Sequence, residues 1–293
     1  MPTTRRTPAP PVTGAPDDAD AAVLDRLRPV AAGHPDVRRH SQARRQVLPR
    51  ADRVTTVTGG WALERVLAAG THVESALWCP GEGRAADDPA AAAAVVRVAG
   101  RAHRISERTL ARLHPGLAAP SLAALVRLPA WEPRVVLAGG ARLVLVADGI
   151  EYAGNLGTLI RTADACAADA LVLTSATARV THPKTFVASR GTVLTMPVLE
   201  YAEVGQAHRD LAAAGFTAFL ADPDGGTSYR EAGLGEGPTA VVVGSEGRGL
   251  CEAWRRDGLA RVSIPMRGEA DSLNVAVSAA VLLFEARAAL DQQ

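Results

Sequence analysis

The chain has 293 residues, enough for two domains of ordinary size with extensions. Its 47% hydrophobic residues can build a sizeable core, while the lack of a bilayer-length apolar run and of an apolar secretory segment near Met1 predicts a soluble, cytoplasmic protein with no membrane partner. The formal net charge of +1 excludes a polycation that would coat nucleic acid through bulk charge alone.

Residues 1–36 are rich in Pro, Ala, Thr and Asp and carry few large apolar side chains, so we expect a disordered tail. Strand and helix patterns then alternate over a predicted small α/β domain, residues 37–129. The stretch from Pro129 to Arg142 has two prolines and a Gly-Gly pair, which makes residues 130–142 the linker candidate. The predicted strands are 54–57, 73–78 and 122–128, and the predicted helices are 61–69, closed by Gly70, 88–98 and 107–113.

A second domain is predicted over residues 143–293, where short apolar strands alternate with helix-sized segments. Strands that are apolar throughout are typical of a parallel sheet covered by helices on both faces, so we expect an α/β fold. Ligands of such sheets bind beyond the carboxyl ends of the strands, which directs attention to the loops that follow them. The predicted strands are 143–148, 170–174, 195–200, 217–221, 239–243 and 261–264.

Arginines are concentrated between Arg38 and Arg53, where six of them accompany a single acid, Asp52. Such a cluster could neutralise RNA phosphates, and a solvated helix face explains it equally well. The three cysteines, by contrast, are far apart and form no CxxC pair, which argues against a disulfide framework or a zinc site. We therefore expect no metal.

Three loops carry polar residues at predicted strand ends. After the first strand, Asn155 is placed to cap a helix, and Arg161 lies off the apolar stripe of that helix, pointing to a pocket or to solvent. After 239–243, the segment GSEGRGL has three glycines around Glu246, without the spacing of a Walker or dinucleotide loop; a tight turn into a helix over 250–257 is an equal alternative. After 261–264, Ser272 or Asn274 can cap a strongly apolar last helix.

Together these loops resemble the signature motifs of the SpoU (TrmH-like) RNA ribose 2′-O-methyltransferases. The matching patterns are NxGxxxRT at residues 155–162, VVGSEGxG at 242–249 and SIPMxxxxxSLNVxVSxxxxLFEA at 263–286. The resemblance implies a SPOUT-type catalytic domain with a C-terminal trefoil knot, a homodimer, and S-adenosylmethionine as cofactor. More weakly, residues 40–128 resemble the small L30e-like RNA-binding domain that precedes the catalytic domain in several members.

The motif positions also imply site residues. Asn155, Arg161, Glu246, Ser272 and Asn274 are the candidates for substrate positioning and chemistry. The cofactor candidates are Gly244, Ile264 and Leu273, with Val243, Ala221 and Met266 as weaker ones. The candidates for RNA contact are Arg38, Arg39, Arg44, Arg45 and Arg190, although a surface arginine is an equal reading of Arg190.

The family usually assigns removal of the hydroxyl proton to Arg161. A guanidinium has a pKa above about 12 and is a poor base, so we prefer a bidentate clamp on the phosphate beside the target ribose. Asn155 would support the arginine, Glu246 would orient Arg161 or Asn274, and Ser272 and Asn274 would hold the methionine end or the ribose.

The predicted substrate is structured RNA. The extra N-terminal domain favours 23S ribosomal RNA, with antibiotic resistance as one consequence seen in the family. A transfer RNA methyltransferase and a catalytically silent RNA-binding protein of the same fold are the alternatives. A nicotinamide oxidoreductase is disfavoured because GIEYAGNLG lacks the required glycine spacing.

Overall fold

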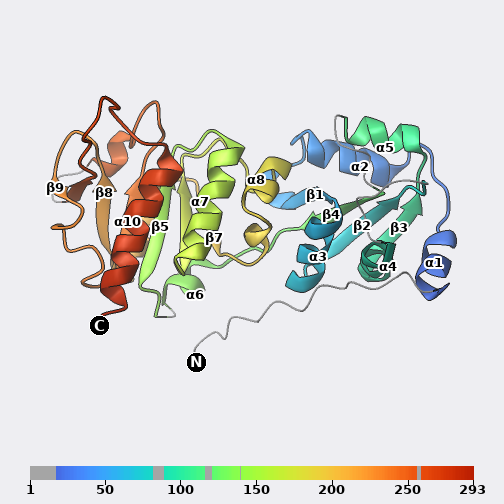
Figure 1. Cartoon of the computed structure of the whole chain (residues 1–293), viewed down its shortest axis with the longest axis horizontal. Coiled ribbons are helices and arrows are strands. Elements are labelled where there is room, and N and C mark those ends of the chain that lie inside the picture. The colour runs from blue at the N-terminus through green and yellow to red at the C-terminus, as the bar shows by residue number, and fades with distance from the viewer. Residues whose placement is uncertain (1–17, 82–88, 116–120, 139, 256–258) are drawn as a thin grey trace. The chain divides into compact units, whose positions relative to one another are not determined.

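The structure, a computed structural model, describes residues 18–81, 89–115, 121–138, 140–255 and 259–293 (Figure 1). The chain divides into two compact units. Unit 1 comprises Met1–Pro129 and the later segment Thr181–Val187, and unit 2 comprises Ala130–Val180 and Ala188–Gln293. The later segment belongs to unit 1 because Gln46 exchanges two hydrogen bonds with Thr181, at 3.1 and 3.0 Å, and Trp61 stacks on Phe186.

Unit 1 is built on a four-stranded sheet with the order β1-β4-β2-β3. Strand β4 is antiparallel to β1 and β2, while β3 is parallel to β2. Gly70 ends α3 in the left-handed conformation, at φ +61°, as the sequence predicts. The strands are β1 (Val54–Thr58), β2 (Val73–Trp78), β3 (Ala99–Arg104) and β4 (Leu122–Arg127), and the helices are α2 (Pro35–Arg44), α3 (Gly60–Ala69), α4 (Pro89–Val98) and α5 (Glu107–Leu113).

The predicted tail and linker both differ from the structure. Within the expected tail, residues 18–36 are ordered: α1 (Asp18–Asp25) buries Leu24, and Asp20 pairs with Arg97 at 2.7 Å. The composition of the sequence did not predict this ordered segment, which is held by a buried leucine and an ion pair. Residues 1–17 of the expected tail lie outside the described residues. Within the expected linker, α6 (Pro133–Ala138) buries Leu137 in the core of unit 2.

Unit 2 contains a seven-stranded sheet with the order β7-β6-β5-β10-β8-β11-β9, in which every pair is parallel. The chain builds outward from β5 through β6 to β7, and later strands occupy the other side of β5. Loops that follow β5 and β10 therefore leave the sheet at its topological switch point. The strands are β5 (Leu143–Asp148), β6 (Ala170–Thr174), β7 (Val198–Tyr201), β8 (Thr217–Ala221), β9 (Thr227–Ser228), β10 (Thr239–Val243) and β11 (Ala260–Ser263).

Helices cover both faces of this sheet, as predicted. Because side chains alternate along a strand, Val144 and Val146 of β5 face the core cluster that contains Leu211 of α9 (Val204–Ala213) and Trp254, while Leu145 points to the other face. On that other face, α7 (Ala153–Ala165) and α10 (Val275–Leu290) lie side by side (Figure 1).

Two predicted elements of unit 2 differ from the structure by more than one residue. The strand expected over 195–200 begins only at Val198, because Thr192–Leu194 forms a 3-10 turn. The helix expected over 250–257 is a 3-10 turn, Glu252–Trp254, and residues 256–258 lie outside the described part. The remaining helix, α8 (Pro183–Ala188), is short. Among the described residues, every helix is too short or too polar to cross a lipid bilayer.

Candidate active site

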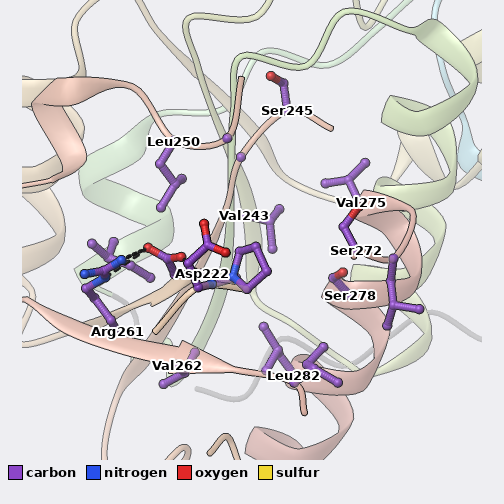
Figure 2. A pocket seen from close by; sticks show the side chains of 18 of the residues that line it. Asp222, Val243, Ser245, Leu250, Arg261, Val262, Ser272, Val275, Ser278 and Leu282 are labelled. Atoms are coloured by element: carbon purple, nitrogen blue, oxygen red, sulfur yellow. Dashed lines mark hydrogen bonds and ion pairs between the residues drawn. The ribbon is translucent and has the colours of Figure 1, made fainter. Parts of the chain in front are cut away.

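A cavity of unit 2 lies beyond the carboxyl ends of β8, β10 and β11 and reaches the start of α10. Its volume is about 580 Å³, within the range of small-molecule sites. Figure 2 shows Val275, Ser278 and Leu282 of α10 on one side of the cavity and the strand residues on the other. All six cofactor candidates line it: Ala221, Val243, Gly244, Ile264, Met266 and Leu273.

The cavity wall is divided between apolar and charged side chains. Val243, Leu250 and Leu282 form apolar surface, while Asp222 is held by Arg261 at the end of β8 (Figure 2). Burial opposes ionisation of Asp222, but hydrogen bonds from Arg261 and from the backbone N–H of Asp224 outweigh it and lower the pKa of the carboxyl. The cavity can therefore accommodate a ligand with a flat apolar part and polar groups directed at a fixed carboxylate.

The glycine loop after β10 closes on itself. Ser245 and Gly249 exchange two backbone hydrogen bonds, at 3.1 and 2.8 Å. A Cβ at Gly244 would overlap the backbone carbonyl of Gly249, and Gly249 has φ +64°. Glycine is thus required here for the turn itself, which presents Glu246 at the rim of the cavity.

Glu246 joins three loops that are distant in the sequence. Its Oε1 accepts hydrogen bonds from Asn155 Nδ2 at 3.1 Å, from the Val275 backbone N–H at 3.3 Å, and from Asn274 Nδ2. Asn274 Nδ2 also lies 3.4 Å from Asn155 Oδ1. The predicted residues Asn155, Glu246 and Asn274 therefore form one hydrogen-bonded cluster, and Glu246 orients Asn274 rather than Arg161.

Asn274 has a second role, as the N-cap of α10. Its Oδ1 accepts a hydrogen bond from the Ala276 backbone N–H at 3.0 Å. Of the two caps that the sequence allows for this helix, Ser272 and Asn274, the structure uses Asn274. The other alternative, Ser272, lines the cavity, and its Oγ lies 3.5 Å from Asp271 Oδ1.

The prediction that Asn155 caps α7 is wrong. The helix begins at Ala153 with Tyr152 as the N-cap residue, so Asn155 lies within the first turn and its amide is available to Glu246. A second cavity of about 300 Å³ lies beside it, lined by Tyr152, Asn155, Glu246 and Arg248 among others. Because both cavities share Glu246, the asparagine cluster lies where two ligands could meet.

Arg161 is exposed further along α7, outside the residues that line either cavity. Among the described residues its guanidinium forms no ion pair or hydrogen bond. The structure thus leaves the side chain unengaged and does not place it in the Asn155 cluster. Arg190 is also exposed, in a left-handed backbone conformation with φ 54°.

The arginines on and directly after α2 in unit 1 are not equivalent. Arg38 and Arg45 are exposed and Arg44 is half-buried. Arg39 instead pairs with Glu74 at 2.9 Å and with Asp52 at 3.0 Å. The prediction of Arg39 as a phosphate ligand is therefore not supported, because its donors are engaged by carboxylates within the unit.

Sequence reasoning missed Asp148 and Asp222. Asp148, the last residue of β5, is buried; its Oδ1 accepts from Thr174 Oγ1 and its Oδ2 from the Cys251 backbone N–H, both at 2.8 Å. It thereby ties the segment after the glycine loop to the sheet. The available signal was an acid at the end of an otherwise apolar strand, a pattern that Asp222 repeats one position after β8.

Comparison with known proteins agrees with this architecture. Residues 142–284 match the SpoU rRNA Methylase family. Over 147 residues the chain is 37% identical to the 23S rRNA (guanosine(2553)-2'-O)-methyltransferase RlmP of Bacillus subtilis. The aligned region covers 50% of this chain and 58% of that protein. The match thus spans less than two thirds of that relative's length.

Two solved structures share the fold along most of the chain. The SpoU methyltransferase AviRb from Streptomyces viridochromogenes, in complex with AdoMet, has a TM-score of 0.74 at 25% identity, covering 87% of this chain and 97% of its own. The AdoMet-bound rRNA methyltransferase from Sinorhizobium meliloti has a TM-score of 0.77 at 24% identity, covering 89% and 97%. The solved structures agree with the fold, and the family match identifies residues 142–284 as a SpoU rRNA Methylase domain.

Proposed function

We propose that the chain transfers a methyl group from S-adenosylmethionine to a ribose 2′-hydroxyl of structured RNA, with 23S ribosomal RNA as the substrate. The observation that carries the proposal is the cluster of Asn155, Glu246 and Asn274 at the junction of two cavities. One cavity would take the methyl donor and the other the ribose. The 23S rRNA substrate is inferred from the Bacillus subtilis relative, a 23S rRNA 2'-O-methyltransferase.

The residues of the larger cavity fit the cofactor. Apolar side chains such as Val243 and Leu250 suit an adenine ring, and the ionised Asp222 suits ribose hydroxyls or a cationic group. Ile264 and Leu273, at the two ends of the loop between β11 and α10, line the same cavity, and their backbone polar groups would contact the cofactor. When bound, S-adenosylmethionine supplies an electrophilic methyl group whose leaving thioether is neutral, so the proposed reaction requires no metal.

The proposed roles of the polar residues follow their contacts. Glu246 and Asn155 hold the Asn274 amide between Leu273 and Val275, two residues that line the larger cavity, and from there it would orient the ribose or the methionine end. Ser272 lines the same cavity and can hydrogen-bond either ligand. Arg161 has free donors and acts as a bidentate clamp on the RNA phosphate, with the proton leaving through phosphate or water.

Unit 1 is proposed as the L30e-like RNA-binding domain, residues 37–129, placed ahead of the methyltransferase domain, residues 143–293. Its support is two exposed arginines, Arg38 on α2 and Arg45 directly after the helix. With exposed Arg190 in unit 2, these side chains would neutralise backbone phosphates. Since ribosomal RNA is the proposed substrate, we place the protein in the cytoplasm.

A C-terminal trefoil knot is proposed for unit 2. Strand β10 is inserted between β5 and β8, and the segment after β11 must return across the strand ends before α10 packs beside α7. Such a path is what a C-terminal segment threaded through a loop would require.

A homodimer is proposed through the outer face of α10. Val277 is 48% exposed and Phe284, two turns later, is 50% exposed on the same side of the helix. We expect Phe284→Glu to yield a monomer in sedimentation experiments and to abolish methyl transfer, while Val135→Glu, at an exposed valine of α6, leaves the dimer intact. A monomeric wild-type chain would contradict the proposal.

Calorimetry tests the proposed cofactor. Wild-type protein is expected to bind S-adenosylmethionine and not to bind NAD. Ser278→Phe would fill the cavity from α10 and abolish binding, whereas Val135→Phe, at a site outside the cavity, would leave binding unchanged. Equal binding by the Ser278 variant, or no heat with S-adenosylmethionine, would refute the assignment.

A further inference from the structure

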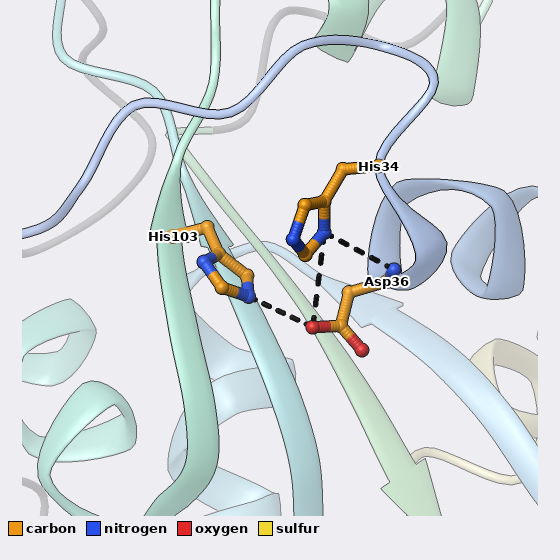
Figure 3. Close-up of side chains that lie close together, drawn as sticks. All are labelled: His34, Asp36 and His103. Carbon is orange, nitrogen blue, oxygen red and sulfur yellow. Dashed lines mark hydrogen bonds and ion pairs between the residues drawn. The ribbon is translucent and has the colours of Figure 1, made fainter.

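Unit 1 contains a cluster of potential metal ligands that the proposed methyl transfer does not use. His34 precedes α2, Asp36 lies in its first turn, and His103 lies on β3 (Figure 3). The three side chains point toward one another although His103 is 67 residues beyond Asp36. One ligand atom from each lies within 4.8 Å of the other two.

We propose that His34 Nδ1, Asp36 Oδ2 and His103 Nε2 form a binding site for a divalent transition-metal ion, with Zn²⁺ as the ion of choice. Two imidazoles and one carboxylate are a common zinc ligand set, which leaves a fourth position for water. The three ligands belong to unit 1, and none of them lines the larger cavity of unit 2.

The spacing of the ligand atoms suits a tetrahedral ion. Ligands at about 2.0–2.2 Å from zinc lie roughly 3.3–3.5 Å apart. Here Asp36 Oδ2 is 3.9 Å from His34 Nδ1 and 2.8 Å from His103 Nε2. The two ring nitrogens lie within 4.8 Å of each other. Rotation of both rings about their side-chain bonds would bring the three ligand atoms to zinc distances.

Arg101 fixes the orientation of the Asp36 carboxylate through hydrogen bonds. Its Nη2 donates to Asp36 Oδ1 at 2.8 Å, and its Nε donates to Oδ1 at 3.0 Å and Oδ2 at 3.1 Å. Oδ1 is therefore engaged mainly by the guanidinium, and Oδ2 is directed at both histidines. Ligating carboxylates are typically fixed by such partners, although the positive charge of Arg101 reduces the affinity for a cation.

Access and neighbouring contacts permit binding. The side chain of Asp36 is 7% exposed, that of His103 is 17% exposed and that of His34 is 31% exposed, so an ion can enter from solvent on the His34 side. An ion would replace the weak 3.3 Å hydrogen bond from the Asp36 backbone N–H to His34 Nδ1. It would join the start of α2, the helix that carries exposed Arg38, to strand β3.

The test uses the full chain without a histidine tag, stripped with a chelator and then supplied with Zn²⁺. We expect one tightly held equivalent by elemental analysis after desalting, and a rise of several degrees in the thermal midpoint. Failure of the wild-type chain to retain zinc, with no change in the midpoint, would overturn the proposal.

Matched variants separate ligation from folding. His34→Asn removes the imidazole but keeps an N-cap side chain, and His103→Gln keeps a hydrogen-bond donor toward Asp36. Both are expected to fold, as checked by circular dichroism, and to lose the bound equivalent. His72→Gln, at an exposed histidine of the same unit, is expected to retain it. Equal zinc retention by the His34 and His103 variants would refute the site.

Should a variant fold poorly, Co²⁺ absorption of the wild-type chain provides a second readout. Bound in this site, Co²⁺ should give visible bands of a low-coordinate nitrogen and oxygen environment, and Zn²⁺ should displace them. A spectrum of hexahydrated Co²⁺ alone would overturn the proposal.

Discussion

Replacement of Asn274 separates its two roles, because its two side-chain atoms make different contacts. Oδ1 caps α10 through the Ala276 N–H at 3.0 Å, while Nδ2 donates to Glu246 and to Asn155. Asn274→Ser keeps a capping oxygen and removes the amide donor. Asn274→Ala removes both.

The expected magnitudes differ accordingly. Loss of an N-cap costs about 1 kcal/mol, which lowers the thermal midpoint by roughly 2–4 °C in a chain of this size. A hydrogen bond to a charged group is worth about 1.5–3 kcal/mol, and exposure of this cluster places the loss at the lower end. If the Asn274 amide contributes this hydrogen-bond energy in the transition state, its loss lowers turnover about tenfold.

The assay combines thermal denaturation with the initial rate of methyl transfer to RNA. We expect Asn274→Ser to lose about tenfold in rate with a midpoint close to wild type, and Asn274→Ala to lose both rate and about 2–4 °C. Full activity of the serine variant would refute the positioning role of the amide, and an unchanged midpoint of the alanine variant would refute the cap.

Other substitutions test the remaining residues. Arg161→Lys should reduce turnover at least tenfold with unchanged RNA affinity, because a lysine cannot make the bidentate contact; near-normal turnover would exclude the clamp. Arg38→Ala should weaken RNA binding and lower its log–log salt slope by about 0.7–0.9, whereas Arg39→Ala should mainly lower stability, since Glu74 is buried against it. Burial, with the nearby charge of His114, lowers the pKa of His40 to about 3, so His40 stays neutral in the fold and charges near pH 6.5 when unfolded. Its contribution to the free energy of unfolding is therefore complete above about pH 6.5 and falls by about 1.4 kcal/mol per pH unit between there and about pH 3. Urea titrations should find this slope reduced in His40→Gln.

The sequence predicts the fold best where one physical signal dominates. Strands such as Leu143–Asp148 and Thr239–Val243 are buried on both faces and are therefore apolar apart from one polar residue at an end, so their position and parallel pairing follow directly. Strand β3 (Ala99–Arg104) was missed because it is a partly exposed edge strand with charged side chains. Helix α1 was missed because its order comes from packing on distant residues.

The motif positions predicted which polar residues lie together, whereas local propensity and charge gave wrong contacts elsewhere. The motifs brought Asn155 and Glu246 to one site, yet the propensity of asparagine for N-caps gave the wrong start for α7. Arg39 was predicted to bind phosphate from its charge alone, because its partner Glu74 lies 35 positions further along the sequence. The approach of His103 to Asp36 likewise depends on the strand order of unit 1, which no local pattern specifies.

The central claim is methyl transfer to a ribose oxygen, and it is tested most directly by incubating the purified chain with methyl-labelled S-adenosylmethionine, 23S rRNA and, in parallel, transfer RNA. The account predicts label on the 2′-oxygen of a defined nucleotide of the 23S rRNA, lost in Arg161→Ala. Label on transfer RNA alone would show that transfer RNA, and not 23S rRNA, is the substrate. Label on a base, or no label on any RNA, would contradict the account.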